Sequence, residues 1–327
     1  MSSARFDFIP LVLLAAIALG ALALIGSPAT WVTLTVAGLA MGLLIFIMSS
    51  GLTLVFGLMD VMNFAHGLFI AVGAYVAASL VRLFPAQAGS ESFAANLVAL
   101  APALLAAMAA AGLLGLFFER VIIRPVYGQH LKQILITTGG MIVAEQLIHV
   151  IWGPDLITLE RPGSLRGAIL FGDVALEKYR LAAVLLGLAV FVGLAVVLNR
   201  TKIGLLIRAG VENGEMVEAM GYRIRRLFIA VFVAGSALAG LGGALWGMYQ
   251  EAVTVAIGAQ MIVLIFIVII IGGLGSVTGC FVGALAVGLL ANYVSYLSPK
   301  VALGSNILLM VIVLLWRPRG LYPAGGR

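Results

Sequence analysis

Ionisable residues that interrupt long apolar runs are the first candidates for chemistry in this sequence, because a charge at membrane depth is costly and usually marks function. Glu145 and His149 are four residues apart, so they would share one face of a helix. They could act as a proton relay or as a structural polar pair. His149 stands beside Trp152 near the end of its apolar run, which favours the structural pair. We expect Glu251 in water at the end of its helix. The full set of candidates is Asp60, His66, Glu145, His149 and Glu251.

Arrangements typical of catalysis or metal binding are missing from the sequence. The single cysteine, Cys280, can form neither an intrachain disulfide nor a metal site alone. The sequence contains no His-x-x-x-His pair and no nucleophile elbow. The glycine-rich stretch GGLGSVTG, residues 272–279, lacks the lysine of a phosphate-binding loop. We therefore expect no enzyme, no bound cofactor, no metal site and no nucleic-acid partner.

The composition predicts a membrane protein. Of the 327 residues, 63% are hydrophobic and 10% are charged, and the mean hydropathy is +1.19. A soluble domain is about half apolar and about a quarter charged. We expect one all-α, polytopic transmembrane domain over residues 1–327, embedded in a lipid bilayer. Apolar runs of suitable length predict ten spans, at 9–26, 31–48, 61–81, 94–118, 133–151, 180–199, 227–250, 258–277, 280–297 and 303–316.

Basic residues indicate the direction of the spans. They gather before residue 9, in 119–132, in 200–226 and after 317, and ten spans place all four regions on one side. The positive-inside rule makes that side the cytoplasm, so both termini are expected there. A cleaved signal peptide is disfavoured for the first span by Asp7 and by the apolar run that follows. The opposite loop 152–179 predicts a periplasmic hairpin or surface helix, which either faces a partner or is a passive connector.

One short tract holds much of the charge. Residues 200–226 carry nine of the 32 charged residues, 19 basic and 13 acidic. Asn213 can cap a helix over about 214–220, and Gly221 suits the left-handed position that often follows a helix. A helix this short has only marginal stability alone in water. It therefore either docks onto a partner or belongs to a solvated loop.

Two segments predict breaks in helices at membrane depth. FGLMDVMNFAHG, residues 56–67, lies between the second and third spans, and GGLGSVTGC, residues 272–280, lies between the eighth and ninth. Non-helical backbone in a membrane is tolerated where it is buried in protein or lines a cavity. These breaks could form part of a translocation pathway or serve structure alone. Their candidate residues are Asn63, Phe64, His66, Gly67, Gly273 and Gly275.

Several stretches resemble one family. GLTLVFGLMDVMNFAHGLFIAVGAYVA (51–77) looks like the signature of branched-chain amino-acid ABC importer permeases of the LivH type. ERVIIRPVYG (119–128), GGLGSVTGCFVGALAVG (272–288) and RPRGL (317–321) are similar to the same family. RAGVENGEMVEAMG (208–221) resembles the cytoplasmic coupling loop of ABC importer permeases. Leu68 departs from the family, where many members have an acidic or small residue.

The resemblance implies a permease fold and a set of partners. These are a second permease of the LivM type, two ATP-binding subunits that use ATP, and a periplasmic substrate-binding protein, all at a bacterial inner membrane. The charged loop would then form a coupling helix that docks on an ATP-binding subunit. Branched-chain amino acids are the default solutes, with related small solutes as alternatives. The residues assigned to coupling are Glu212, Glu215, Met216, Glu218, Ala219, Met220 and Gly221.

A rival hypothesis is an ion-coupled secondary carrier that works alone. It would be driven by a proton or sodium gradient instead of ATP. The few ionisable residues in the spans are the ones it would use. The two hypotheses differ in whether transport requires separate ATP-hydrolysing subunits.

Overall fold

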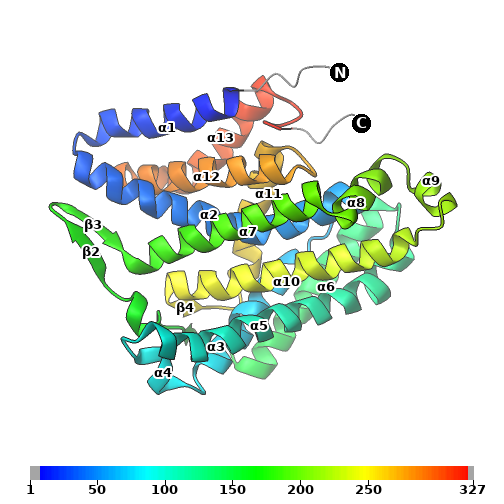
Figure 1. Ribbon diagram of the computed structural model, residues 1–327, viewed down its shortest axis with the longest axis horizontal. Helices are drawn as coiled ribbons and strands as arrows, with labels where there is room; N and C mark the ends of the chain where they lie inside the picture. Colours follow the sequence, from blue (N-terminus) through cyan, green and yellow to red (C-terminus); the bar gives the residue numbers. More distant parts are fainter. Residues whose placement is uncertain (1–7, 323–327) are drawn as a thin grey trace.

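Ten apolar helices form the body of the protein (Figure 1). The computed structural model describes residues 8–322, apart from the side chains at positions 58, 211, 212, 214 and 303. Six helices are long and apolar enough to cross a membrane, and four shorter apolar helices accompany them, which agrees with the ten predicted spans. The ten are α1 Ile9–Ile25, α2 Pro28–Met59, α3 His66–Val81, α5 Phe93–Phe117, α6 His130–Trp152, α7 Lys178–Arg200, α10 Ile224–Gln250, α11 Ile257–Gly272, α12 Val277–Leu297 and α13 Ala302–Trp316.

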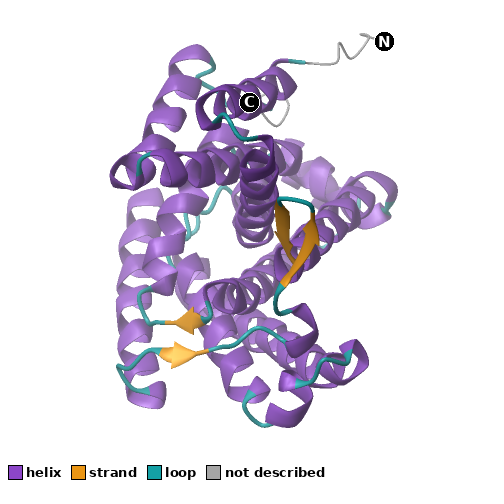
Figure 2. Cartoon of the chain, turned by 90° about the vertical axis from the view of Figure 1, so that its left-hand side faces the viewer, coloured by secondary structure: helices purple, strands orange, loops and turns teal. Residues whose placement is uncertain are grey.

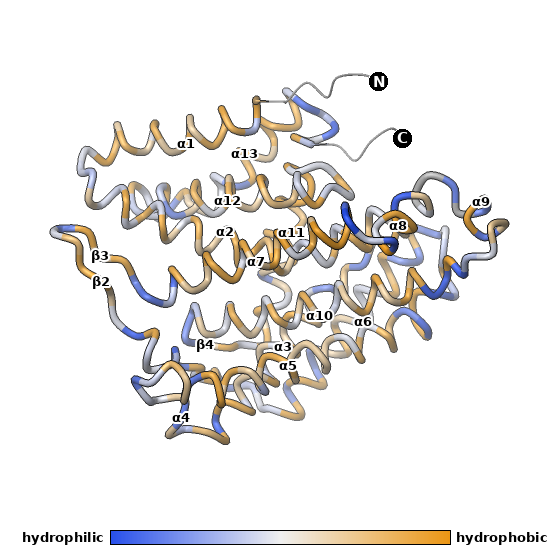
Figure 3. Tube along the Cα trace, in the orientation of Figure 1, coloured by the Kyte–Doolittle hydropathy of each residue, from blue (hydrophilic) through white to orange (hydrophobic). Residues whose placement is uncertain are grey.

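Smaller elements gather at the two ends of this bundle. At one end lie α8 (Lys202–Glu212) and α9 (Gly214–Ala219), together with the start of α1. At the other end lie α4 (Pro85–Gly89) and the hairpin of β2 (Ala168–Phe171) and β3 (Val174–Glu177). Hydrophilic segments concentrate at these ends, and the helices between them are apolar (Figure 3). This distribution is that of a multi-pass membrane protein.

Helices α2, α3, α10 and α12 form the centre of the bundle and approach one another through glycines. A Cβ added to Gly51 of α2 would overlap the backbone of Gly235 in α10. Gly243 of α10 lies in the same way against the backbone of Ile70 in α3. Lipid supplies no hydrophobic drive between helices, so close packing of small residues stabilises such contacts. Gly279 and Gly283 of α12 lie against the backbone of α11, at Gly272 and Val268, whereas Gly247 of α10 lies against the side chains of Val253 and Leu159.

The segment after α6 folds over the end of α10. Strand β1 (Ile157–Thr158) pairs antiparallel with β4 (Ala252–Val253), which follows α10. The strands β2 and β3 pair from Ala168 with Glu177 to Phe171 with Val174, so this loop contains the hairpin, one of its two predicted alternatives. Figure 2, which faces this end of the molecule, shows both small sheets.

Arg161 ties this segment to two helices. Its Nη1 lies 2.9 Å from Glu177 Oε2, at the start of α7, and its Nη2 donates to the carbonyl oxygen of Tyr249 at 3.0 Å, near the end of α10. Its Nε lies 3.2 Å from Glu251 Oε1. The Glu251 side chain is 51% exposed, as expected from the sequence. One guanidinium therefore joins the beginning of α7 and the end of α10.

Three expectations differ from the structure. Helix α2 continues to Met59, beyond the predicted span 31–48, and the third span begins at His66 instead of 61, because Asp60 adopts a left-handed backbone (φ +51°) and ends α2. The ninth span begins at Val277, three residues early, because Ser276 caps it through the amide of Gly279. Within the described residues, the side chains of Glu145 and His149 form no hydrogen bond or ion pair with each other, and Glu145 Oε1 is buried without a hydrogen-bond partner. The predicted polar pair is therefore wrong.

Candidate functional site

The short helix α9 has defined caps at both ends. Asn213 Oδ1 accepts a hydrogen bond from the amide of Met216 at 2.9 Å. At the other end the Gly221 amide donates to Glu218 O at 2.8 Å, and the Tyr222 amide donates to Val217 O at 3.2 Å. Gly221 has φ +88°, so this pair of bonds is a Schellman motif with glycine at the left-handed position. Both predicted caps are thus present, although the helix ends at Ala219.

Helix α9 presents an exposed face. Val217 is buried, whereas Met216 and Met220 are 59% and 60% exposed. Glu215, Glu218 and Ala219 are also exposed, and the side chain of Glu212 lies outside the described residues. Two acids and two methionines on an exposed helix are suited to charge pairing and adaptable apolar contact.

Helix α8 anchors this unit to the bundle. Thr201 caps α8 by accepting from the Gly204 amide at 3.2 Å. Ile207 of α8 is buried in a small cluster with Val231 of α10, and Leu54 of α2 packs against them. The position of α9 is therefore tied to the transmembrane helices α2 and α10 through α8.

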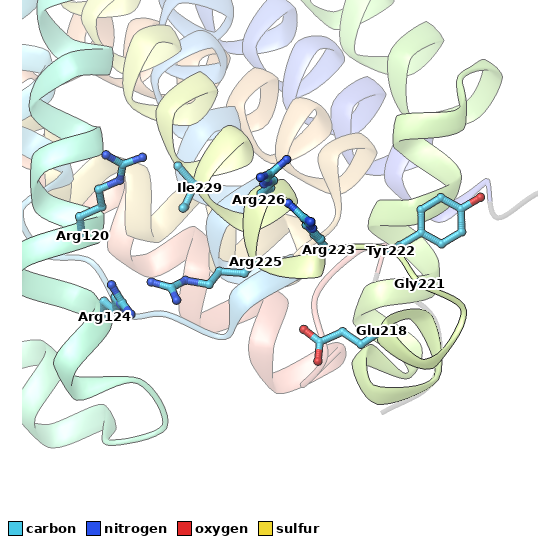
Figure 4. A pocket seen from close by; sticks show the side chains of 9 residues that line it. All are labelled: Arg120, Arg124, Glu218, Gly221, Tyr222, Arg223, Arg225, Arg226 and Ile229. Atoms are coloured by element: carbon cyan, nitrogen blue, oxygen red, sulfur yellow. The ribbon is translucent and has the colours of Figure 1, made fainter.

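A basic hollow lies between α9 and the α5–α6 connection (Figure 4). Its volume is about 760 Å³, and a second hollow of about 540 Å³ shares Arg124, Glu218 and Arg225 with it. The lining residues of the first are Arg120, Arg124, Glu218, Gly221, Tyr222, Arg223, Arg225, Arg226 and Ile229. We did not predict this convergence, because the two groups of arginines lie about a hundred residues apart in the sequence.

A buried carboxylate, that of Glu119, directly precedes Arg120 of the basic hollow in the sequence. Glu119 is fully buried in a π-helical turn, Phe118–Ile123, and its Oε1 accepts from Tyr127 Oη at 3.1 Å. Burial raises the pKa of Tyr127 above its ordinary value, and the Glu119 carboxylate raises it further. Tyr127 therefore stays a protonated donor to Glu119 at neutral pH.

The first helix break returns the chain into the bundle. Helix α3 begins beside the middle of α2, because His66 Nε2 lies 2.9 Å from the carbonyl oxygen of Met48. His66 and Asn63 are both 1% exposed, and Asn63 Oδ1 accepts from the Ala65 amide at 3.0 Å. The backbone of Gly67 lies against that of Gly258 at the start of α11. Thus α3 and α11 begin side by side within the bundle.

Helix α6 satisfies the backbone of this break. The Met62 amide donates to Gln133 Oε1 at 3.3 Å, and the Phe64 amide donates to Thr137 Oγ1 at 3.2 Å. Both acceptors are buried. The Phe64 ring packs on Phe266 of α11, with centroids 4.8 Å apart. We did not predict a role for Gln133 and Thr137, although two polar residues four apart on a membrane helix could have indicated one.

The second helix break lies between α11 and α12. Gly273 and Gly275 have φ values of +101° and +80°, which glycine adopts readily. The chain after α13 covers this break, because the amides of Leu321 and Tyr322 donate to the carbonyl oxygens of Ile271 and Gly272 at 2.8 and 2.9 Å. Gly275 also lies against Gly57 near the end of α2. Both predicted breaks are therefore present. Helix α11 runs from the first break to the second, and the end of α2 lies against the second.

Comparison with known families identifies the class of protein. Residues 34–316 match the family described as branched-chain amino acid transport system / permease component. The chain belongs to this family. Three relatives, similar over most of their length, support the LivH type within it. As a permease component the chain is not itself an enzyme, and the family favours the permease over the ion-coupled carrier.

The relatives are named as permeases of branched-chain amino acid transport. The chain is 28% identical to the high-affinity branched-chain amino acid transport system permease protein BraD of Pseudomonas aeruginosa, over 87% of this chain and 93% of the relative. It is 25% identical to LivH of Escherichia coli (strain K12), over 87% and 92% of the two chains. It is also 25% identical to the probable permease LivH of Methanocaldococcus jannaschii, over 85% and 88%. No solved structure matches the chain.

Proposed function

We propose that this chain is the permease subunit of a binding-protein-dependent ABC importer for branched-chain amino acids or related small solutes. Membership of the permease family over residues 34–316 carries the proposal, and the names of three relatives support the solute class. A second permease of the LivM type would complete the membrane unit. Two ATP-binding subunits would use the ATP, and a substrate-binding protein would deliver the solute.

Helix α9 is the proposed contact with an ATP-binding subunit. It is capped at both ends, anchored through α8, and exposes acids and methionines on one surface. A rigid, exposed element of this kind transmits movement between a soluble subunit and the membrane helices to which it is tied. The proposed contact residues are Glu212, Glu215, Met216, Glu218, Ala219, Met220 and Gly221.

The two helix breaks are the proposed neighbourhood of the translocation pathway. Helices α3 and α11 have 16 residues each, about 24 Å, which is short of a hydrocarbon core of about 30 Å. Transporters use such discontinuous helices to build solute sites in the middle of the membrane. The residues proposed for this region are Asn63, Phe64, His66, Gly67, Gly273 and Gly275.

The proposed orientation places α8 and α9 in the cytoplasm. The segments rich in Lys and Arg, 119–132 and 200–226, support it through the positive-inside rule. The segment 152–179 would then face the periplasm and the substrate-binding protein. Both termini would be cytoplasmic, in a bacterial inner membrane.

Reconstituted transport tests the proposal. Proteoliposomes containing this chain, the second permease and the ATP-binding subunits should take up labelled leucine only with lumenal access to ATP and with binding protein outside. Omitting the ATP-binding subunits should abolish uptake. Uptake by this chain alone, driven by a proton or sodium gradient, would instead establish the carrier.

A further inference from the structure

We infer that the basic hollow is a binding site for the headgroup of an anionic phospholipid. Its lining brings five guanidinium groups together with one carboxylate, that of Glu218. Two arginines come from the α5–α6 connection and three from the start of α10, about a hundred residues later in the chain. Arginine binds phosphate well, because its planar guanidinium can donate two parallel hydrogen bonds to it.

The five guanidinium groups lack acidic partners. Within residues 8–322, none of Arg120, Arg124, Arg223, Arg225 and Arg226 forms an ion pair with a described carboxylate. The nearby Glu119 is buried and accepts its hydrogen bond from Tyr127. The first turn of α10 contains no acidic residue, and its N-cap side chain forms no capping hydrogen bond. The hollow therefore carries a net positive charge that a bound anion would balance.

The surface next to the hollow is apolar, as a lipid requires. Leu113 and Phe117 lie four residues apart on one face at the end of α5, just before the π-helical turn that carries Arg120. They are 68% and 52% exposed. Ile229 lines the hollow from α10 and continues the apolar surface on that helix. A headgroup bound among the arginines would thus leave its acyl chains along α5 and α10. An acidic protein surface would gain nothing from contact with these apolar side chains.

Binding of defined lipids to the full-length chain tests the inference. Native mass spectrometry would count phosphatidylglycerol and phosphatidylcholine with identical acyl chains retained by the protein. We expect preferential retention of phosphatidylglycerol, weakened about tenfold to thirtyfold in R120Q/R124Q, the factor that two basic residues supply at an anionic surface. R200Q/R208Q removes the same charge from exposed positions outside the hollow, and should retain the lipid.

Two further arms make the result decisive. R225Q/R226Q removes charge from the other side of the hollow, and should weaken retention even if R120Q/R124Q folds poorly. Millimolar inorganic phosphate should displace little phosphatidylglycerol, because free phosphate lacks the acyl chains.

Equal retention of both lipids by the unaltered chain, full displacement by phosphate, or equal loss in R120Q/R124Q and R200Q/R208Q would overturn the inference. Loss of ATP-binding subunits from R120Q/R124Q with unchanged lipid retention would assign the hollow to a protein partner instead. Lipid retention does not depend on which solute is carried, so it is independent of the proposed function.

Discussion

His66 Nε2 lies 2.9 Å from the carbonyl oxygen of Met48, eleven residues before the end of α2. The first helix break must therefore run back along α2 before α3 can begin. Residues 61–63 are irregular and residues 64–65 form a turn, so the return uses only five residues, and the His66 ring fixes its end against α2.

We expect His66→Ala to reduce uptake more than His149→Ala. His66 is buried and contacts α2, and the loss of a buried hydrogen-bonded group costs about 1–3 kcal/mol. His149 is only partly buried and lies near the end of α6. Uptake of labelled leucine at matched membrane levels measures the difference. Normal uptake by both variants would remove the first break from the mechanism.

Thr137→Val should destabilise the protein by about 1–3 kcal/mol, because the Phe64 amide loses its buried acceptor. The adjacent Thr138 is exposed, so Thr138→Val makes the same chemical change without that loss. Thermal unfolding in detergent compares the two. Equal midpoints for both variants would show that the break does not depend on α6.

Gly221→Val should impair docking of the ATP-binding subunit. A β-branched residue is strained by about 1–2 kcal/mol in the left-handed region, where Gly221 has φ +88°. Glu218→Lys should act at the same contact by reversing charge on the exposed face. Co-purification of the ATP-binding subunit and uptake are the measurements. Gly193→Val, at an open position in α7, is the control for a glycine-to-valine change, and full co-purification with both α9 variants would leave α9 as a solvated loop.

Gly320→Ala should lower the unfolding temperature more than Gly26→Ala. Both glycines have positive φ values, +81° and +70°, so the backbone strain is similar. A Cβ at Gly320 would lie 2.5 Å from Gly273 Cα, whereas a Cβ at Gly26 would meet nothing within 4 Å. The difference between the two variants isolates the contact that covers the second break. A larger loss in Gly26→Ala would contradict it.

Cysteine labelling should place α9 and the β2–β3 hairpin on opposite sides of the membrane. Glu215→Cys and Asp173→Cys introduce thiols at exposed positions, and the native Cys280 is fully buried. An impermeant maleimide added to intact cells with a permeable outer membrane should react at 173 and not at 215. Labelling of both sites from outside would refute the proposed orientation.

Local patterns predicted the parts of the structure that local physics determines. Apolar run lengths predicted the ten helices, and Asn213 and Gly221 predicted the caps of α9. The return of the chain at 61–65 was not predictable in the same way, because the groups that satisfy it, Gln133 and Thr137, lie some 70 residues away.

Long-range contacts account for the other misses. The basic hollow joins the α5–α6 connection to the start of α10, and no local pattern shows that they meet. Pairing of Leu321 and Tyr322 with the end of α11 likewise depends on tertiary packing. Glu145 and His149 show the reverse error, since correct helical spacing did not produce a contact between them.

Arg161 has a mechanical consequence for how the bundle can move. Because its guanidinium joins the start of α7 to the end of α10 and its side chain is only 20% exposed, dissolved salt screens this junction weakly. The two helices are thus joined at this end, and a relative rotation of α7 would pivot there. Helix α7 has 23 residues and is about 34 Å long, and its other end leads into α8, which packs on the bundle through Ile207 and is followed by α9. A rotation of α7 by a few degrees about this junction would displace its other end by ångströms, at the place where an ATP-binding subunit would act.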